Sequence, residues 1–224
     1  EYRRYITTFN NGTIGDSFDI AKRCLNPNAA AHWASKINGD QWIVHQHAQK
    51  VFSAIRERKR ICYEADGKID AIKEILKIFP DRKTIIFSES IKFSDRVKDA
   101  IGNKCVTFHS KMGVKARRNA LDEFSLPGSN ITTISTVKAL NVGFNVPSCS
   151  LGITASGSSK SLDLFQRLGR TLRWEEGKDA IFIQLFLDLE CIDLVSQDRK
   201  WVKRRSISIK GAVEWLSGVN KLKS

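Results

Sequence analysis

The sequence has no uninterrupted apolar run approaching the ~20 residues that a membrane-spanning helix requires. Its longest apolar stretch, residues 181–189, is interrupted by Gln184 and Asp188. Neither a signal peptide nor an initiator Met opens the chain, so we expect part of a longer polypeptide that has no membrane partner. Of its 224 residues, 42% are apolar, which is enough to build a buried core.

Cysteine is scarce and scattered. The five cysteines form no CxxC pair and stand at Cys24, Cys62, Cys105, Cys149 and Cys191. An odd, dispersed set argues against a disulfide framework or a zinc ribbon and favours a reducing compartment, either the cytoplasm or the nucleoid or nucleus. His45 and His47 are two residues apart and point to different sides of a helix, so we expect no metal site.

Acidic residues are outnumbered by basic ones. The chain holds 24 Asp and Glu against 37 Lys and Arg, a formal net charge of +13. This charge predicts attraction to a polyanion, with nucleic acid first and an acidic membrane surface second. The basic residues cluster at 56–60, 115–118 and 199–205. A charged run by itself also fits a solvated face, so the function must be argued from motifs.

Residues 1–65 lack the alternation of a strand and form the first expected domain. A helix is predicted from a cap at Asp16 to Leu25, a break at 26–28, and a long helix over 41–63 with a basic end. That basic end suits either nucleic-acid phosphates or a connector, and we favour a connector packed on the following domain. For the five Trp, base stacking and core burial both remain open, with burial the default.

From residue 68 onward short apolar strands alternate with helical segments. Strands are predicted over 84–88, 105–108, 131–135, 149–155 and 180–187, and helices over 68–79, 90–101, 114–124, 161–172 and 188–202. This order predicts an α/β fold with a parallel sheet and helices on both of its faces. Such folds bind ligands at the loops after the carboxyl ends of the strands.

A phosphate-binding loop of the GxxxxGK[ST] type is absent. The segment 152–160 approaches one, but Ser158 stands where Lys is required. The chain also lacks a pair of carboxylates suited to Mg²⁺ and any nucleophile beside a base. A self-contained enzyme with its own α/β chemistry is therefore a poor hypothesis.

The sharpest chemical signal is a pair of arginines. Arg170 and Arg173 are three residues apart on one face of a predicted helix, with Gly169 allowing close approach. A guanidinium is always charged and its fork matches phosphate oxygens. Taken alone, the pair also fits a solvated basic helix.

The arginine pair belongs to the last of four motifs that follow one another along the chain. The run QRLGRTLR at 166–173 has the pattern QxxGRxxR, and 136–147 has the pattern T-x6-G-x-[DN]-x-P after a strand. Upstream stand IIFS at 85–88 and a stretch from His109 to Phe124. Together they resemble the C-terminal motifs of superfamily-two helicases and translocases. The chain departs from the family at Ser110, which replaces Gly, and at Asn145, which replaces the commoner Asp.

The resemblance implies a RecA-like lobe over residues 66–205, with an extension at 206–224. It implies that ATP and Mg²⁺ are held mainly by an N-terminal RecA-like lobe of the same polypeptide, which is the expected partner. Arg170 and Arg173 would be the arginine fingers. Gln166, Gly143 and Asn145 would contact the nucleotide.

The resemblance also implies a nucleic-acid interface, formed by Ser88, Thr136, Lys138 and Arg117. Ordinary turn chemistry at a strand end is the alternative for Ser88, Thr136 and Gly143 taken singly. Gln166, in place of the His of DEAD-box proteins, resembles the DNA-acting group of repair, restriction and phage helicases and Snf2-like translocases. DNA is thus the expected partner and RNA the alternative. A non-enzymatic nucleic-acid-binding module built on a degenerate lobe is the second functional hypothesis.

Overall fold

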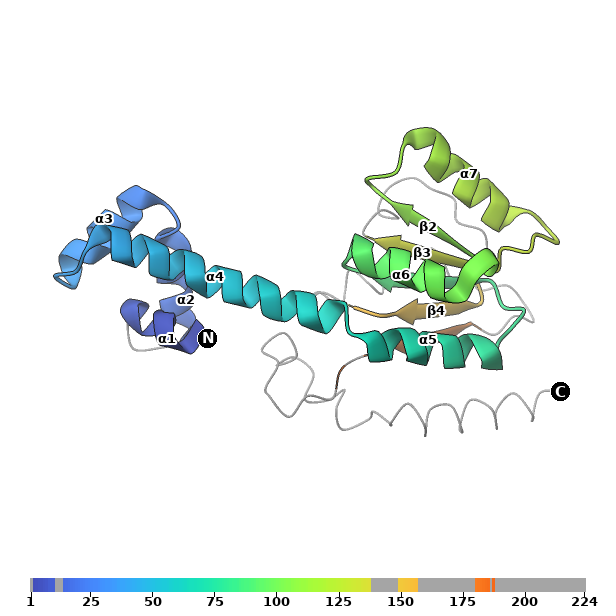
Figure 1. The fold of residues 1–224 in the computed structure, drawn as a ribbon, viewed down its shortest axis with the longest axis horizontal. Coiled ribbons are helices and arrows are strands. Elements are labelled where there is room, and N and C mark those ends of the chain that lie inside the picture. Colours follow the sequence, from blue (N-terminus) through green and yellow to red (C-terminus); the bar gives the residue numbers. More distant parts are fainter. Residues whose placement is uncertain (1, 11–13, 138–148, 157–179, 186, 188–224) are drawn as a thin grey trace. The chain divides into compact units, whose positions relative to one another are not determined.

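The computed structural model describes residues 2–10, 14–137, 149–156, 180–185 and 187 (Figure 1). The chain divides into two compact units, residues 1–61 and 62–224, each with its own hydrophobic core. No helix among the described residues is long and apolar enough to cross a membrane. The domain limits expected from the sequence, at residues 65 and 205, stay predictions.

The first unit is helical. Its elements are α1 (Tyr2–Ile6), a 3₁₀ turn (Thr7–Phe9), α2 (Ile14–Arg23), α3 (Pro27–Lys36) and α4 (Gln41–Tyr63), whose last two residues belong to the second unit. The core gathers mainly small apolar side chains, which let helices approach closely: Phe9, Ala21, Cys24, Ala30, Ala34, Val44, Ala48 and Val51. The limits of the long helix are those predicted.

The segment predicted only as a break starts a helix of its own. The side chain of Asn26 accepts a hydrogen bond from the amide of Asn28 at 2.9 Å, and Pro27 occupies the first helical position of α3. Both residues are well suited to a helix start, because an Asn cap satisfies an orphan amide and proline has no amide to leave orphaned. The helix before the break runs from Ile14 to Arg23, so its predicted limits of 16 and 25 were wrong by two residues.

The second unit alternates helices and strands as predicted. Its elements are α5 (Asp66–Ile78), β1 (Thr84–Ser88), α6 (Ile91–Ile101), a 3₁₀ turn (Gly102–Lys104), β2 (Cys105–His109), α7 (Val114–Ser125), β3 (Thr133–Val137), β4 (Leu151–Thr154) and β5 (Ile181–Gln184). The strands pair in the order β2-β3-β1-β4-β5, and every pairing is parallel. The helices predicted over 161–172 and 188–202 lie outside the described residues.

Helices cover both faces of this sheet (Figure 1). Ile86 packs in one core cluster with apolar residues of α5 and α6, whereas its neighbours Ile85 and Phe87 pack in another with residues of α7. The alternation follows from the two-residue period of a strand, which sends successive side chains to opposite faces. The predicted α/β class, with a parallel sheet, helices on both faces and a preceding helical segment, is confirmed.

Two serine hydroxyls of helix α6 have structural roles, one at its start and one against the sheet. The side chain of Ser90 caps the helix by accepting a hydrogen bond from the amide of Phe93 at 3.3 Å. One turn further, the hydroxyl oxygens of Ser94 and Ser135 are 2.7 Å apart and fully buried. Because a buried hydroxyl without a partner is costly, this pair sets the position of α6 along β3.

The amino edge of the sheet is tied together by Lys83, which directly precedes β1. Its ammonium donates hydrogen bonds to the carbonyls of Phe124, 2.7 Å away, and Ile131, 2.6 Å away. It also lies 5.0 Å from the centre of the Phe124 ring. Burial lowers the pKa of this lysine. The Lys83 ammonium is therefore engaged within the protein.

Three of the four described cysteines pack inside the protein, whereas Cys62 is half-buried. Cys24, Cys105 and Cys149 are buried, as the sequence predicted. Burial raises the pKa of Cys105 and of Cys149 to about 12. A thiol with such a pKa stays protonated at neutral pH and is a poor nucleophile. Cys191 lies outside the described residues.

Candidate nucleic-acid interface

Two predicted interface residues meet at the carboxyl edge of the sheet. Strands β1 and β3 run in register, with Phe87 opposite Thr136 and Ser88 opposite Val137. The hydroxyl oxygen of Ser88 is 3.1 Å from the carbonyl oxygen of Ser90 and 3.5 Å from that of Thr136. The structure therefore brings Ser88 and Thr136 together where parallel α/β folds bind their ligands.

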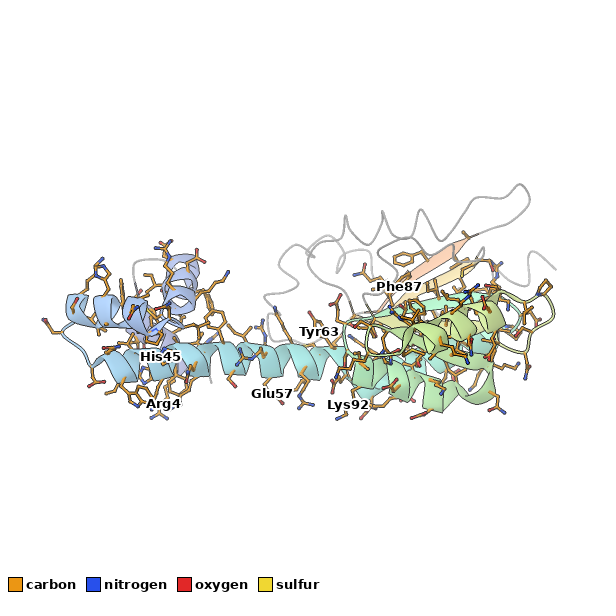
Figure 2. All side chains as sticks on the ribbon, turned by 90° about the horizontal axis from the view of Figure 1, so that it is seen from above. Arg4, His45, Glu57, Tyr63, Phe87 and Lys92 are labelled. Atoms are coloured by element: carbon orange, nitrogen blue, oxygen red, sulfur yellow. The ribbon has the colours of Figure 1, made fainter. Side chains whose placement is uncertain are left out.

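The hydroxyl of Thr136 has no hydrogen-bond partner among the described residues, although the residue is only 1% exposed. The same holds for the hydroxyl of Thr154 on β4. Phe87, labelled in Figure 2, pairs with both threonines and so lies between them in one row across the sheet. Leaving a buried polar group unpaired costs about 1–3 kcal/mol, so two such groups in one row mark this edge as a place where polar ligand atoms are accommodated.

The turn after β1 is anchored to the end of β4. The amide of Glu89 donates a hydrogen bond to the hydroxyl of Ser156 at 2.8 Å, and the amide of Ala155 donates to the carbonyl of Phe87 at 2.9 Å. The first of these bonds joins Glu89, the residue after Ser88, to Ser156, which follows strand β4. The position of the β1 end is thus set from the neighbouring strand.

Arg117 lies in the first turn of α7, the helix that begins five residues after the last residue of β2. Its Nε atom is buried without a partner among the described residues, as is Nδ1 of His109 at the end of β2. Nε2 of His109 is 3.6 Å from a carboxylate oxygen of Asp95. The N-cap residue Gly113 has no side chain to satisfy the first amides of the helix. An arginine beside free amides at a helix N-terminus favours an anion there.

Further positive charge surrounds this helix start. Lys111, Lys115 and Arg118 are exposed, and Arg118 makes a long contact of 4.0 Å with Asp122. A surface ion pair of this length contributes little, so the guanidinium of Arg118 keeps most of its attraction for other anions. The basic cluster predicted at 115–118, which includes Arg117, therefore lies at the start of α7.

Six predicted site residues lie outside the described residues, and their roles stay predictions. They are Lys138, Gly143, Asn145, Gln166, Arg170 and Arg173. The sequence reasoning in turn missed Thr154 and Ser156. Both stand at the end of a strand, as Ser88 and Thr136 do, so the same strand-end argument applied to β4 would have found them.

Replacing Thr136 by Val should separate the ligand-binding and structural roles of this edge. Because the hydroxyl has no hydrogen-bond partner among the described residues, its loss should leave the free energy of unfolding unchanged or slightly higher, while affinity for an oligonucleotide falls. The matched control is Ser135→Ala, which strands the buried hydroxyl of Ser94 and should cost about 1–3 kcal/mol of stability. Urea unfolding and fluorescence anisotropy measure the two quantities. Equal destabilisation by both variants would contradict the assignment.

Comparison with known proteins defines the class. Residues 67–175 match the family model described as the helicase conserved C-terminal domain. The DNA 3′-5′ translocase XPB2 of Sulfurisphaera tokodaii is 27% identical over 140 residues, which cover 62% of this chain and 31% of that protein. The ATP-dependent rRNA helicase RRP3 of Coccidioides immitis is 28% identical over 119 residues, covering 52% and 25%.

A solved structure agrees on the fold. The C-terminal part of the Fun30 ATPase domain has a TM-score of 0.50 and 16% identity, and covers 98% of this chain and 91% of that one. The second unit is thus a RecA-like lobe. The family match and the sequence relatives support the C-terminal lobe of a superfamily-two helicase or translocase. The chain spans about a third or less of the length of the curated relatives it matches.

Proposed function

We propose that this chain is the C-terminal motor lobe of an ATP-dependent DNA helicase or translocase. The observation that carries the proposal is the meeting of Ser88 and Thr136 at the carboxyl edge of the sheet, where the Thr136 hydroxyl has no partner among the described residues. These residues belong to two motifs that are far apart in the sequence. Their meeting at a ligand-binding edge is what a nucleic-acid interface requires.

At this interface, backbone phosphates would be contacted by hydroxyls and amides at the strand ends and by the basic start of α7. Thr136 and Ser88 would serve the first role, and Arg117 the second, with Lys138 adding a charge after β3. Such contacts hold a strand in register without selecting its bases, which suits an enzyme that steps along nucleic acid. The expected location is wherever its nucleic acid lies, in the cytoplasm or in the nucleoid or nucleus.

The nucleotide would lie between this lobe and an N-terminal lobe. Gln166, Gly143 and Asn145 would contact ATP from this side, while Arg170 and Arg173 would stabilise the charge that develops on the transferring γ-phosphoryl group. Within the described residues, no group of three potential ligands gathers to hold a metal ion. We assign Mg²⁺ to the other lobe.

We favour DNA over RNA on sequence grounds. Gln166 stands where DEAD-box proteins carry His, and the basic segment 199–205 resembles the tail of repair-type members. One of the two sequence relatives is a DNA translocase and the other an rRNA helicase, so the relatives themselves do not decide. The shared phosphate contacts would serve either polymer.

The alternative is a non-enzymatic nucleic-acid-binding module, which the net charge of +13 also suits. Measuring DNA-stimulated ATP hydrolysis separates the two proposals. The protein made from the complete reading frame should hydrolyse ATP faster when single-stranded DNA is added, and the 224-residue chain alone should hydrolyse almost none. Strand binding without stimulated hydrolysis by the complete protein would support the module instead.

A further inference from the structure

Trp42 is a large apolar residue that lies mostly outside the protein, at 67% exposure. The carboxylate of Asp40 accepts hydrogen bonds from the amides of Trp42, at 2.7 Å, and Ile43, at 3.0 Å. This cap fixes the backbone of the first turn of α4, which carries the indole. By contrast, Trp33 is partly buried and its Nε1 donates to the carbonyl of Thr8 at 3.0 Å. Core burial, which is the default for most of the tryptophans, does not apply to Trp42.

Five further side chains line up with Trp42 along α4. We call this set the α4 stripe: Trp42, His45, Gln49, Ser53, Arg56 and Arg60. The intervals of three and four residues place all six on one face of the helix. The opposite face carries Val44, Ala48 and Val51, which are buried in the core of the helical unit. The stripe is thus the face that the core leaves outside.

The chemistry of the stripe changes from aromatic to basic along the helix. The rings of Trp42 and His45 are 6.3 Å apart, and the side chain of Gln49 is 2.9 Å from His45. Beyond Ser53 come the guanidinium groups of Arg56 and Arg60. His45 and Glu57, both labelled in Figure 2, lie in the two halves of this helix.

No acidic residue is among the six members of the stripe. The carboxylate of Asp40 is engaged by the first amides of α4, and both oxygens of the Glu57 carboxylate accept hydrogen bonds from Arg60, at 2.9 and 2.5 Å. That exposed pair contributes little stability and leaves Arg56 as the principal charge of the stripe. Residues 1–61 carry ten Lys and Arg against five Asp and Glu, so an anion is attracted to this unit as a whole.

We propose that the α4 stripe binds single-stranded DNA, as a second contact outside the motifs of the RecA-like lobe. The stripe is about 27 Å long, since an α-helix rises about 1.5 Å per residue. It offers the two elements that a sequence-tolerant strand site combines, namely an aromatic face for stacking and positive charge for phosphates. A protein partner fits less well, because only one of the six side chains is a large apolar group. The choice of partner rests on the proposed function.

The experiment measures the affinity of the 224-residue chain for a fluorescein-labelled oligodeoxythymidine by anisotropy. Trp42→Ala should weaken binding about 5-fold to 100-fold, and Trp42→Phe should restore most of the affinity, because stacking needs an aromatic face. Arg56→Gln should reduce the magnitude of the log–log salt slope by about 0.7, the value for one phosphate contact on a single strand. The matched control is Arg3→Gln, which removes the same charge from exposed α1 and should leave the affinity nearly unchanged.

The outcomes distinguish this proposal from the motor function. If Trp42→Ala binds like wild type while Thr136→Val binds more weakly, the stripe is not a strand site and the motif interface stands. If Trp42→Ala weakens binding and Thr136→Val does not, the stripe stands and the motif interface is wrong. Wild-type chain that binds no strand overturns both. Melting curves followed by circular dichroism should be nearly the same for Trp42→Ala and wild type, since the indole is mostly exposed.

Discussion

Replacing Arg170 by Ala in the protein made from the complete reading frame is expected to reduce ATP turnover about 10³-fold to 10⁵-fold. In nucleotide hydrolases an arginine of this kind acts on charge that develops in the transition state rather than on the bound nucleotide. ATP binding should therefore largely survive. Steady-state hydrolysis and equilibrium binding of a fluorescent ATP analogue measure the two effects separately.

Two further variants make this experiment specific. Arg170→Lys keeps the charge but loses the planar fork, so it should recover only a small part of the activity. Lys77→Ala removes one positive charge from an exposed position on α5, where the lysine contacts Glu74 at 2.7 Å, and should hydrolyse ATP at the wild-type rate. Near-normal turnover by Arg170→Ala would show that the guanidinium does not face the nucleotide.

Replacing Phe93 by Ala is expected to destabilise the RecA-like lobe by about 3–5 kcal/mol. Phe93 is fully buried on α6 and belongs to the core cluster that also contains Ile86, Val97 and Ile153. Truncation removes a large apolar group and leaves a cavity between α6 and the sheet, which a close-packed core closes only in part. Urea unfolding of the chain, followed by circular dichroism, gives the change in stability.

The neighbouring Lys92 provides the matched control, because it is exposed on the same turn of α6. Lys92→Ala should change the free energy of unfolding by no more than about 0.5 kcal/mol. A similarly small effect of Phe93→Ala would mean that α6 does not pack on the sheet as described. Alanine has a high helix propensity, so a loss of stability in either variant cannot be attributed to a weaker preference for the helix.

The fold was predictable wherever a hydrophobic period was long or a strand was fully buried. Strand β1 has the predicted limits of 84 and 88 because a run of apolar residues ends sharply in polar ones. Helix α3 was missed because Asn26 and Pro27 are common both in turns and at helix starts. Only the alanines that follow distinguish a helix start from a turn, and their amphipathic pattern is too weak to predict a helix.

The candidate site was predictable in part. Ser88 and Thr136 follow from the motifs, and the parallel sheet brings the ends of their two strands to the same edge. That the Thr136 hydroxyl finds no partner within the described part of the chain depends on how neighbouring strands pack, which no local sequence pattern reports. Exposure of Trp42 is likewise a tertiary property, since the sequence shows only an aromatic residue at the start of an amphipathic helix. The roles of Arg170 and Arg173 stay predictions.

The buried contact between Ser94 and Ser135 bears on how such a lobe would carry mechanical load. If α6 slid by one turn along the sheet, both hydroxyls would be stranded in an apolar interface, at a cost of about 1–3 kcal/mol each. Slippage between this helix and the strand that ends in Thr136 is therefore penalised. A force on a nucleic-acid strand bound at that edge would therefore act on α6 and the sheet together, as on one rigid body.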